Sequence, residues 1–217
     1  EEGGGMSQNT STAVMQRRRE AKDSLDDFPT PPWATRALCE WVERNTVNDL
    51  SIQTCREPAA NRGHMVRPLA EYFANVEAAD VHDYGAGFPV RDYLFGELPK
   101  AVDWTISNPP FRLAEQFIER ALATSRCVAM IVRGAFLEGQ GRYDRLFSKM
   151  PPSHVLQFAE RVVMHKGRLA PEGTTATAYA WLVWADRAAD TKLRWIAPCR
   201  KQLERDGDYQ IEKGTRA

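Results

Sequence analysis

The residues best suited to chemistry are Asn108-Pro109-Pro110-Phe111, which directly follow the apolar, β-prone run 102–107. Two consecutive prolines end a strand because neither has an N–H for the sheet, and both fix φ. We therefore expect Asn108 on a rigid turn at the carboxyl end of a buried strand, where ligands bind in open α/β sheets. Many Pro-Pro turns serve only as turns, but composition alone gives this tetrapeptide in roughly one chain of this length per thousand.

A planar amino group is the ligand that suits this turn. The side-chain oxygen of Asn108 and the carbonyl oxygen of Pro109 can each accept a hydrogen bond from its N–H groups. Those bonds favour a pyramidal nitrogen with an exposed lone pair, which can attack an electrophile in line. Positioning and preorganised dipoles, rather than a strong base, would then supply the rate. Asn108, Pro109, Pro110 and Phe111 are the predicted catalytic residues.

The elements that position this turn alternate between strands and helices. Alternation of this kind, followed by closing strands, predicts an α/β fold: a doubly wound, mostly parallel seven-stranded sheet with an antiparallel last strand. The continuous apolar run 127–132 is typical of a central strand covered on both faces. The expected strands are 52–56, 76–81, 102–107, 127–132, 154–158, 177–184 and a short extra one at 192–196.

Three upstream features could hold a second ligand. The small-residue loop 57–63 lies between a strand and a helix, a geometry that lets a ligand approach backbone N–H groups. Asp80 follows about 20 residues later, the spacing at which an acid can bind both hydroxyls of a ribose. Asp92 is a second carboxylate. Thr30 is expected to cap a helix that has Pro31 in its first turn.

Length and composition fit one soluble globular domain with an appendage. The chain has 217 residues, 43% of them hydrophobic and 27% charged. We expect a flexible tail over 1–27, a catalytic domain over 28–190 and an extension over 191–217, whose last dozen residues are polar and expected to be loose. The tail holds Glu1 to Gly5, which resemble a remnant ahead of a natural start at Met6, and the basic run Arg17-Arg18-Arg19.

Composition also argues against several classes of protein. No apolar run approaches the ~18 residues of a membrane span, and no signal peptide is evident, so a cytoplasmic location is expected. A metal site is not expected, because the cysteines and histidines are scattered and form no Cys-x-x-Cys pair. These residues are Cys39, Cys55, Cys127, Cys199, His64, His82, His154 and His165.

Net charge is zero, but its distribution is uneven. Residues 161–217 carry 11 lysines and arginines against 7 acids, a net of +4, and the first 160 residues carry 18 against 22. The C-terminal part is therefore the face that a polyanion would meet.

Together these residues resemble a known family, the S-adenosylmethionine-dependent amino-methyltransferases, specifically the small, phage-associated DNA adenine-N6 methyltransferases. The resemblance runs from Phe28 to Trp184, and Asn108-Pro109-Pro110-Phe111 is its most specific part. It implies a Rossmann-like methyltransferase fold, S-adenosylmethionine as cofactor, and adenine in DNA as substrate. A base in a duplex cannot reach such a site, so it would be flipped out and stacked on Phe111.

The resemblance also implies a role for each motif. Residues 57–63 stand where the cofactor loop belongs, although Asn61 replaces a usual glycine; asparagine tolerates positive φ better than other residues. Asp80 would bind the ribose and Asp92 the adenine amino group, with Tyr93 or Val81 against the ring. The implied cofactor residues are Thr30, Pro31, Glu57, Pro58, Ala59, Asn61, Gly63, Asp80, Val81, Asp92 and Tyr93. The implied nucleic-acid contacts are Arg142, Arg161, His165, Lys166 and Arg168.

Two alternatives stay open at this point. The same turn could hold an RNA base or the side-chain amide of a protein glutamine, with fold and cofactor unchanged. A binding module without activity is the other alternative, because Asn61 departs from the family pattern. The recognition sequence, the oligomeric state and the biological role cannot be inferred from these residues.

Overall fold

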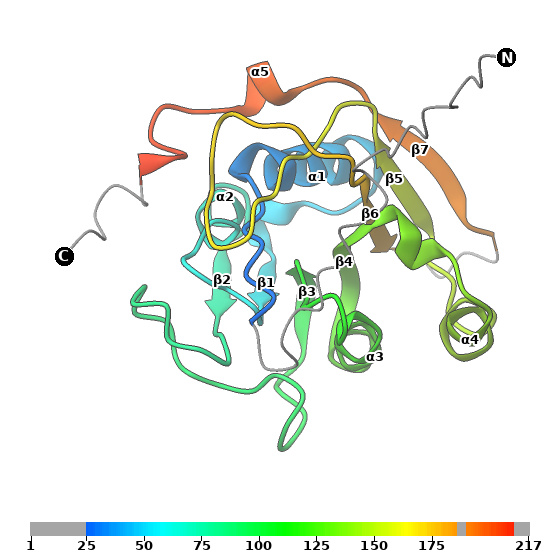
Figure 1. The fold of residues 1–217 in the computed structure, drawn as a ribbon. Helices are drawn as coiled ribbons and strands as arrows, with labels where there is room; N and C mark the ends of the chain where they lie inside the picture. The colour runs from blue at the N-terminus through cyan, green and yellow to red at the C-terminus, as the bar shows by residue number, and fades with distance from the viewer. Residues whose placement is uncertain (1–24, 186–189, 211–217) are drawn as a thin grey trace, which may run out of the picture.

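A seven-stranded sheet in the order β2-β1-β3-β4-β6-β5-β7 forms the centre of the molecule (Figure 1). The structure is a computed structural model and describes residues 25–185 and 190–210. The expected tail before residue 25, with Arg17-Arg18-Arg19, lies outside the described residues. The strands are β1 (Thr54–Glu57), β2 (Asn75–Ala78), β3 (Val102–Ser107), β4 (Ser125–Arg133), β5 (His154–Phe158), β6 (Tyr179–Trp184) and β7 (Lys192–Ile196).

The pairing of the strands confirms the expected mixed sheet. Neighbours are parallel from β2 through β1 and β3 to β4, and β5 is parallel to β7. β6 lies between β4 and β5 and is antiparallel to both. The antiparallel strand is therefore β6, the sixth along the chain. The expected extra strand, β7, comes after it in the sequence and lies at the edge of the sheet beside β5.

Helices cover both faces of the sheet (Figure 1). The helices are α1 (Pro32–Asn45), α2 (Val66–Leu69), α3 (Ala114–Thr124), α4 (Gln140–Arg142) and α5 (Arg200–Leu203). Successive residues of β4 point to opposite faces, as the pleat requires. Cys127, Ala129 and Ile131 pack in the core beneath α1, whereas Val128 and Met130 pack against α3. The central strand is thus buried on both sides.

The start of α1 differs from the expectation. The N-cap position is Pro31, not Thr30, and no side chain caps the helix. Pro32 at the first helical position removes one of the N–H groups that a first turn leaves unpaired, and the Ala34 N–H donates to the Pro31 carbonyl oxygen at 2.9 Å. The Thr30 hydroxyl is instead buried without a hydrogen-bond partner.

The C-terminal segment packs on the domain. The guanidinium of Arg36, in α1, contacts both carboxylate oxygens of Asp208 at 2.8 and 2.9 Å and both oxygens of Glu71 at 2.9 and 2.8 Å. Arg36 and Asp208 are both buried. The expectation of a loose C-terminus is therefore wrong at Asp208, because a buried arginine holds this part of the chain against α1.

The parallel strands bring the candidate residues to one edge. β1 ends at Glu57, β2 ends two residues before Asp80, and β3 ends immediately before Asn108. Because β1, β2 and β3 are parallel neighbours, their carboxyl ends meet there. Within the described ranges, no helix is both long and apolar enough to cross a membrane.

Candidate active site

Asn108 lies at the end of β3 with its amide held in one orientation. Its Nδ2 donates a hydrogen bond to the carbonyl oxygen of Phe28 at 2.7 Å and lies 3.8 Å from the sulfur of Met164. Within the described part of the chain, no hydrogen bond reaches Oδ1 of Asn108. The side chain thus turns its donor inward and leaves its acceptor for a ligand.

Phe111 is fixed by both its backbone and its ring. Its N–H donates to a carboxylate oxygen of Asp26 at 2.8 Å. Its ring lies 5.2 Å from that of Phe28, at a tilt of 45°. The guanidinium of Arg133 lies 3.7 Å from the centre of the Phe111 ring. The aromatic side chain that was expected to stack on a base therefore carries a cation on its face.

A cavity of about 360 Å³ lies beside this turn. That volume falls within the ~300–1,000 Å³ of small-molecule and cofactor pockets. Ten residues expected at a site line it: Thr30, Pro58, Ala59, Asn61, Asp80, Val81, Asp92, Tyr93, Asn108 and Pro110. The structure thus gathers most of the expected cofactor residues, from five segments of the sequence, around one space. We call it the large cavity.

Five of the expected catalytic and cofactor-binding residues do not line the large cavity. Pro31 starts α1, and Glu57 lies fully buried at the end of β1. Gly63 has φ of 83°, and a Cβ there would meet the Phe88 ring at 3.1 Å, so glycine is required by both conformation and space. Pro109 and Phe111 line a second cavity, which shares no lining residue with the large cavity.

Glu57 ties the loop 57–63 to the end of β3, next to the turn 108–111. Its Oε1 accepts hydrogen bonds from the Ser107 hydroxyl at 2.7 Å and from the Ala59 N–H at 2.9 Å. Its Oε2 is buried without a partner. Burial raises the pKa of Glu57 to about 8, against the effect of these two donors, and the charge of Asp80 adds to the increase. At neutral pH this carboxyl is therefore mostly protonated.

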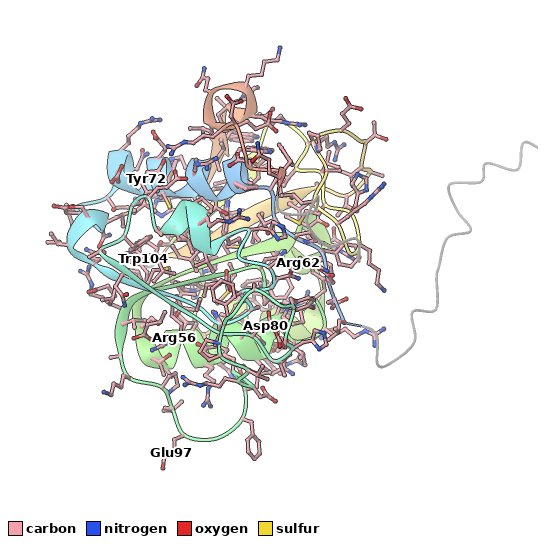
Figure 2. The ribbon with its side chains drawn as sticks, turned by 90° about the vertical axis from the view of Figure 1, so that its left-hand side faces the viewer. Arg56, Arg62, Tyr72, Asp80, Glu97 and Trp104 are labelled. Carbon is pink, nitrogen blue, oxygen red and sulfur yellow. The ribbon has the colours of Figure 1, made fainter. Side chains whose placement is uncertain are left out.

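Asp80 orders the loop from the neighbouring strand. One carboxylate oxygen accepts from the N–H of Asn61 at 2.8 Å, and the other accepts from the N–H of His82 at 2.9 Å. Burial raises the pKa of Asp80, and the backbone donors oppose that effect. In Figure 2, Asp80 and Arg62 lie on the same side of the molecule, away from Glu97 at the tip of a loop.

Asn61 has φ of 49°, and in the described ranges every other residue with positive φ is a glycine. The loop thus keeps the left-handed conformation despite the replacement. The Asn61 side chain adds a contact that glycine would lack: its Nδ2 donates to Asp27 at 2.7 Å. Arg62 forms an ion pair with Asp27 at 3.1 Å. These contacts of Asn61 and Arg62 with Asp27 hold the segment before α1 beside the large cavity.

His64 is a cavity residue that the sequence did not reveal. It lines the large cavity with 2% of its surface exposed, and neither ring nitrogen has a hydrogen-bond partner. Burial lowers its pKa to about 4, and the charges of Arg67 and Arg62 lower it further. It is therefore neutral at physiological pH. Its place directly after Gly63 was the available signal, but a single histidine after a glycine is common.

Asp92 and Tyr93 contribute one exposed and one buried side chain. A carboxylate oxygen of Asp92 accepts from the N–H of Leu94 at 2.8 Å, and the side chain remains exposed. The Tyr93 ring packs against Phe117 at 5.1 Å. An apolar wall and an accessible carboxylate thus meet at one end of the large cavity.

The residues expected to contact nucleic acid separate into two places. Arg142 lines the second cavity. The others lie in the loop 159–178, where Arg161, Lys166 and Arg168 are exposed and His165 is half-buried. This loop crosses the segment before α1 (Figure 1), and the Gly167 N–H donates to the Asp27 carbonyl oxygen at 2.7 Å. The loop therefore forms part of the rim of the site.

The described residues hold no cluster of three or more histidine, cysteine or acidic side chains that could bind a metal. The residues gathered at the site instead suit an organic ligand, since apolar walls surround a few hydrogen-bonding groups.

Comparison with known proteins gives matches among solved structures alone. No protein-family model and no curated protein matches the sequence. A protein from Pyrococcus horikoshii, described as a candidate RNA methyltransferase, superposes with a TM-score of 0.54 at 17% identity, over 76% of this chain and 90% of that one.

Two further similar structures come from type I restriction-modification systems. One is a modification subunit of a candidate type I restriction enzyme from Vibrio vulnificus, with a TM-score of 0.55, 15% identity and 81% of this chain covered. The other is a methyltransferase subunit from Streptococcus thermophilus, with a TM-score of 0.56, 10% identity and 86% covered. This chain spans about half the length of both, 48% and 52%. At identities this low, the superpositions establish the fold alone. The chain has the Rossmann-like α/β fold of methyltransferases.

Proposed function

We propose that this protein is an S-adenosylmethionine-dependent methyltransferase that methylates the exocyclic N6 amino group of adenine in DNA. The observation that carries the proposal is the turn 108–111. Its residues line two different cavities, and among the described residues Oδ1 of Asn108 accepts no hydrogen bond, which suits a transferase with a donor and an acceptor side.

The large cavity is the proposed cofactor site. Its volume suits a nucleoside-sized ligand, and it offers carboxylates for hydroxyl and amino groups beside apolar walls for a ring. Asp80 would accept from the ribose hydroxyls with the lone pairs that its backbone donors leave, and Asp92 would accept from the adenine amino group. Thr30 and His64 each bring a buried polar group without a partner to the same space. Such groups gain most from a polar ligand.

The expected cofactor residues that do not line the large cavity would hold in place the segments that do. Glu57 holds the loop through Ala59, Gly63 allows the turn, and Pro31 fixes the start of α1. The similarity of fold to the Vibrio vulnificus and Streptococcus thermophilus proteins supports a methyl transfer at this position.

When bound, the cofactor supplies an electrophilic methyl group on a positively charged sulfur. Asn108 Oδ1 and the Pro109 carbonyl oxygen would accept hydrogen bonds from the acceptor amino group and hold its lone pair towards that methyl carbon. Held there, the acceptor nitrogen would gain the methyl group in exchange for one N–H proton, which would pass to solvent. Asn108 needs no basicity for this step, because the nitrogen becomes acidic on methylation.

DNA is favoured as the acceptor on two grounds. Two of the structurally similar proteins are subunits of type I restriction-modification systems, and the loop 159–178 brings exposed basic side chains to the rim of the site. The Pyrococcus horikoshii protein, described as a candidate RNA methyltransferase, makes an RNA base the alternative acceptor. A protein glutamine amide has no comparable support.

Transfer of a tritiated methyl group from S-adenosylmethionine to duplex DNA, RNA and protein tests the assignment directly. The proposal expects label in DNA, recovered as N6-methyladenine after digestion. Label in RNA alone would favour the alternative, and label in protein would contradict both.

A further inference from the structure

The second cavity, of about 190 Å³, takes part of its lining from the turn 108–111 but shares no lining residue with the large cavity. Pro110 lines the large cavity, whereas Pro109 and Phe111 line the second. The remaining lining residues are Ala114, Val132, Arg133, Ala135, Phe136 and Arg142. We call this space the acceptor cavity, because it is lined by Pro109, whose carbonyl oxygen would bind the acceptor amino group.

Two arginines are the charged residues that line the acceptor cavity. Arg133 is the last residue of β4, and its guanidinium lies 3.7 Å from the Phe111 ring centre and 5.2 Å from that of Phe28. Arg142 lies 4.0 Å from the Phe136 ring centre, and its Nη1 donates to the carbonyl oxygens of Phe136 and Glu138, both at 2.7 Å. The Nε atoms of both arginines are buried without a hydrogen-bond partner.

The acids nearby have other principal partners. A carboxylate oxygen of Asp26 accepts from the Phe111 N–H at 2.8 Å, and Glu115 is paired with Arg145, although the charge of Arg142 also acts on it. Among the described residues, neither Arg133 nor Arg142 forms an ion pair. Two guanidinium groups that line a cavity together with aromatic rings match the chemistry of a nucleotide: a phosphate for the cations and a base for the rings.

We propose that Arg133 and Arg142 bind a backbone phosphate of the acceptor strand at the acceptor cavity, with Phe111 as the stacking face for the acceptor base. This inference rests on the proposed function and narrows it to acceptors that carry a phosphate, which a glutamine side chain does not. Arg133 covers the face of Phe111 that the base needs. Binding therefore exchanges a cation–π contact for a phosphate contact, and Arg133 acts as a positioning residue.

Fluorescence anisotropy with a labelled single-stranded DNA that contains one adenine tests the proposal without methyl transfer. Arg133→Gln should weaken binding and lower the slope of log affinity against log salt by about one, as expected for one lost phosphate contact. Arg133→Lys should keep the salt slope because the charge remains. Arg142→Gln provides a second variant, should Arg133→Gln fail to fold.

Arg126→Gln is the matched control, since Arg126 lies at the other end of β4, where its side chain contacts Asn48 at 2.8 Å. It should keep the wild-type affinity and slope. The inference is overturned if Arg133→Gln and Arg142→Gln fold but bind with the wild-type slope. Wild-type binding without methyl transfer would refute the proposed function and leave this inference standing. Preferential binding to the matching RNA would support the phosphate site and contradict the assignment of DNA.

Discussion

Asn61 shows how a residue other than glycine can keep the backbone geometry that was expected of the loop 57–63. Its backbone adopts the left-handed conformation for which glycine is usual, and its side chain bonds to Asp27. The sequence could suggest the first property, because asparagine tolerates positive φ. It could not suggest the second, because Asp27 lies 34 residues away in a segment with no periodic pattern.

Substitutions at Asn61 should separate conformation from contact. Asn61→Gly keeps the backbone and loses the bond to Asp27, so we expect a loss of about 1 kcal/mol in the free energy of unfolding. Asn61→Ala should lose a further ~1–2 kcal/mol, because alanine is strained at positive φ. Urea denaturation measures both, with exposed Asn45→Ala as a control. Equal stability of the glycine and alanine variants would contradict this account of the loop.

Glu57 should make stability depend on pH. Its pKa rises from the ordinary value of 4.5 to about 8 in the folded chain, chiefly through burial. The folded protein thus keeps a proton that the unfolded chain has released, so this contribution is full below pH 4.5 and is lost as the pH rises towards 8. Glu57→Gln keeps acceptors for Ser107 and Ala59 without a titrating proton.

The free energy of unfolding should therefore decline less between about pH 4.5 and 8 in Glu57→Gln than in the wild type. Chemical denaturation at a series of pH values measures this difference. Glu97→Gln, at an exposed loop position (Figure 2), is the control and should follow the wild type. Parallel pH profiles for the wild type and Glu57→Gln would show that Glu57 titrates normally.

At the scale of elements, the strands could be predicted and the contacts between distant elements could not. Apolar, β-prone runs locate all seven strands, since burial on both faces leaves a local signature in β4 and its neighbours. The pairing of Arg36 with Asp208 joins residues 172 positions apart and leaves no such signature. In the sequence, Arg133 is likewise an ordinary residue at the end of a strand. Its contact with the Phe111 ring depends on the fold.

The contact between Arg36 in α1 and Asp208 in the C-terminal segment should contribute substantially to the free energy of unfolding. Burial opposes the charge of Arg36, but its hydrogen bonds to Glu71 and Asp208 outweigh this effect and raise the pKa of Arg36. Asp208→Asn leaves a buried cation with Glu71 as its remaining charged partner, so we expect a loss of about 1.5–3 kcal/mol in the free energy of unfolding. Thermal and urea unfolding measure it, with Asp206→Asn, an exposed neighbour, as the control. A loss below about 1 kcal/mol would mean that this segment is not held by the pair.

At the scale of the whole molecule, the sheet explains why the site could largely be predicted. Parallel neighbours β1, β2 and β3 end at one edge, so residues at the ends of expected strands had to meet there. Seven of the ten expected residues that line the large cavity do so for this reason: Pro58, Ala59, Asn61, Asp80, Val81, Asn108 and Pro110. The roles of the cofactor and nucleic-acid residues stay predictions, as do the limits of the expected domain and extension. His64, Arg133 and the division of the turn between two cavities depend on side-chain packing, which local sequence does not encode.

The central claim is that Asn108 acts on the acceptor amino group and not on the cofactor. Asn108→Ala removes Oδ1 from the turn, together with the hydrogen bond from Nδ2 to the Phe28 carbonyl oxygen at the edge of the large cavity. Calorimetric titration with S-adenosylmethionine, alongside tritiated-methyl transfer to DNA, measures both functions in one preparation. We predict that the variant binds S-adenosylmethionine within about threefold of the wild type, a difference of under 1 kcal/mol, and transfers no detectable methyl group. Normal transfer by the variant, or equal loss of binding and transfer, would contradict the account.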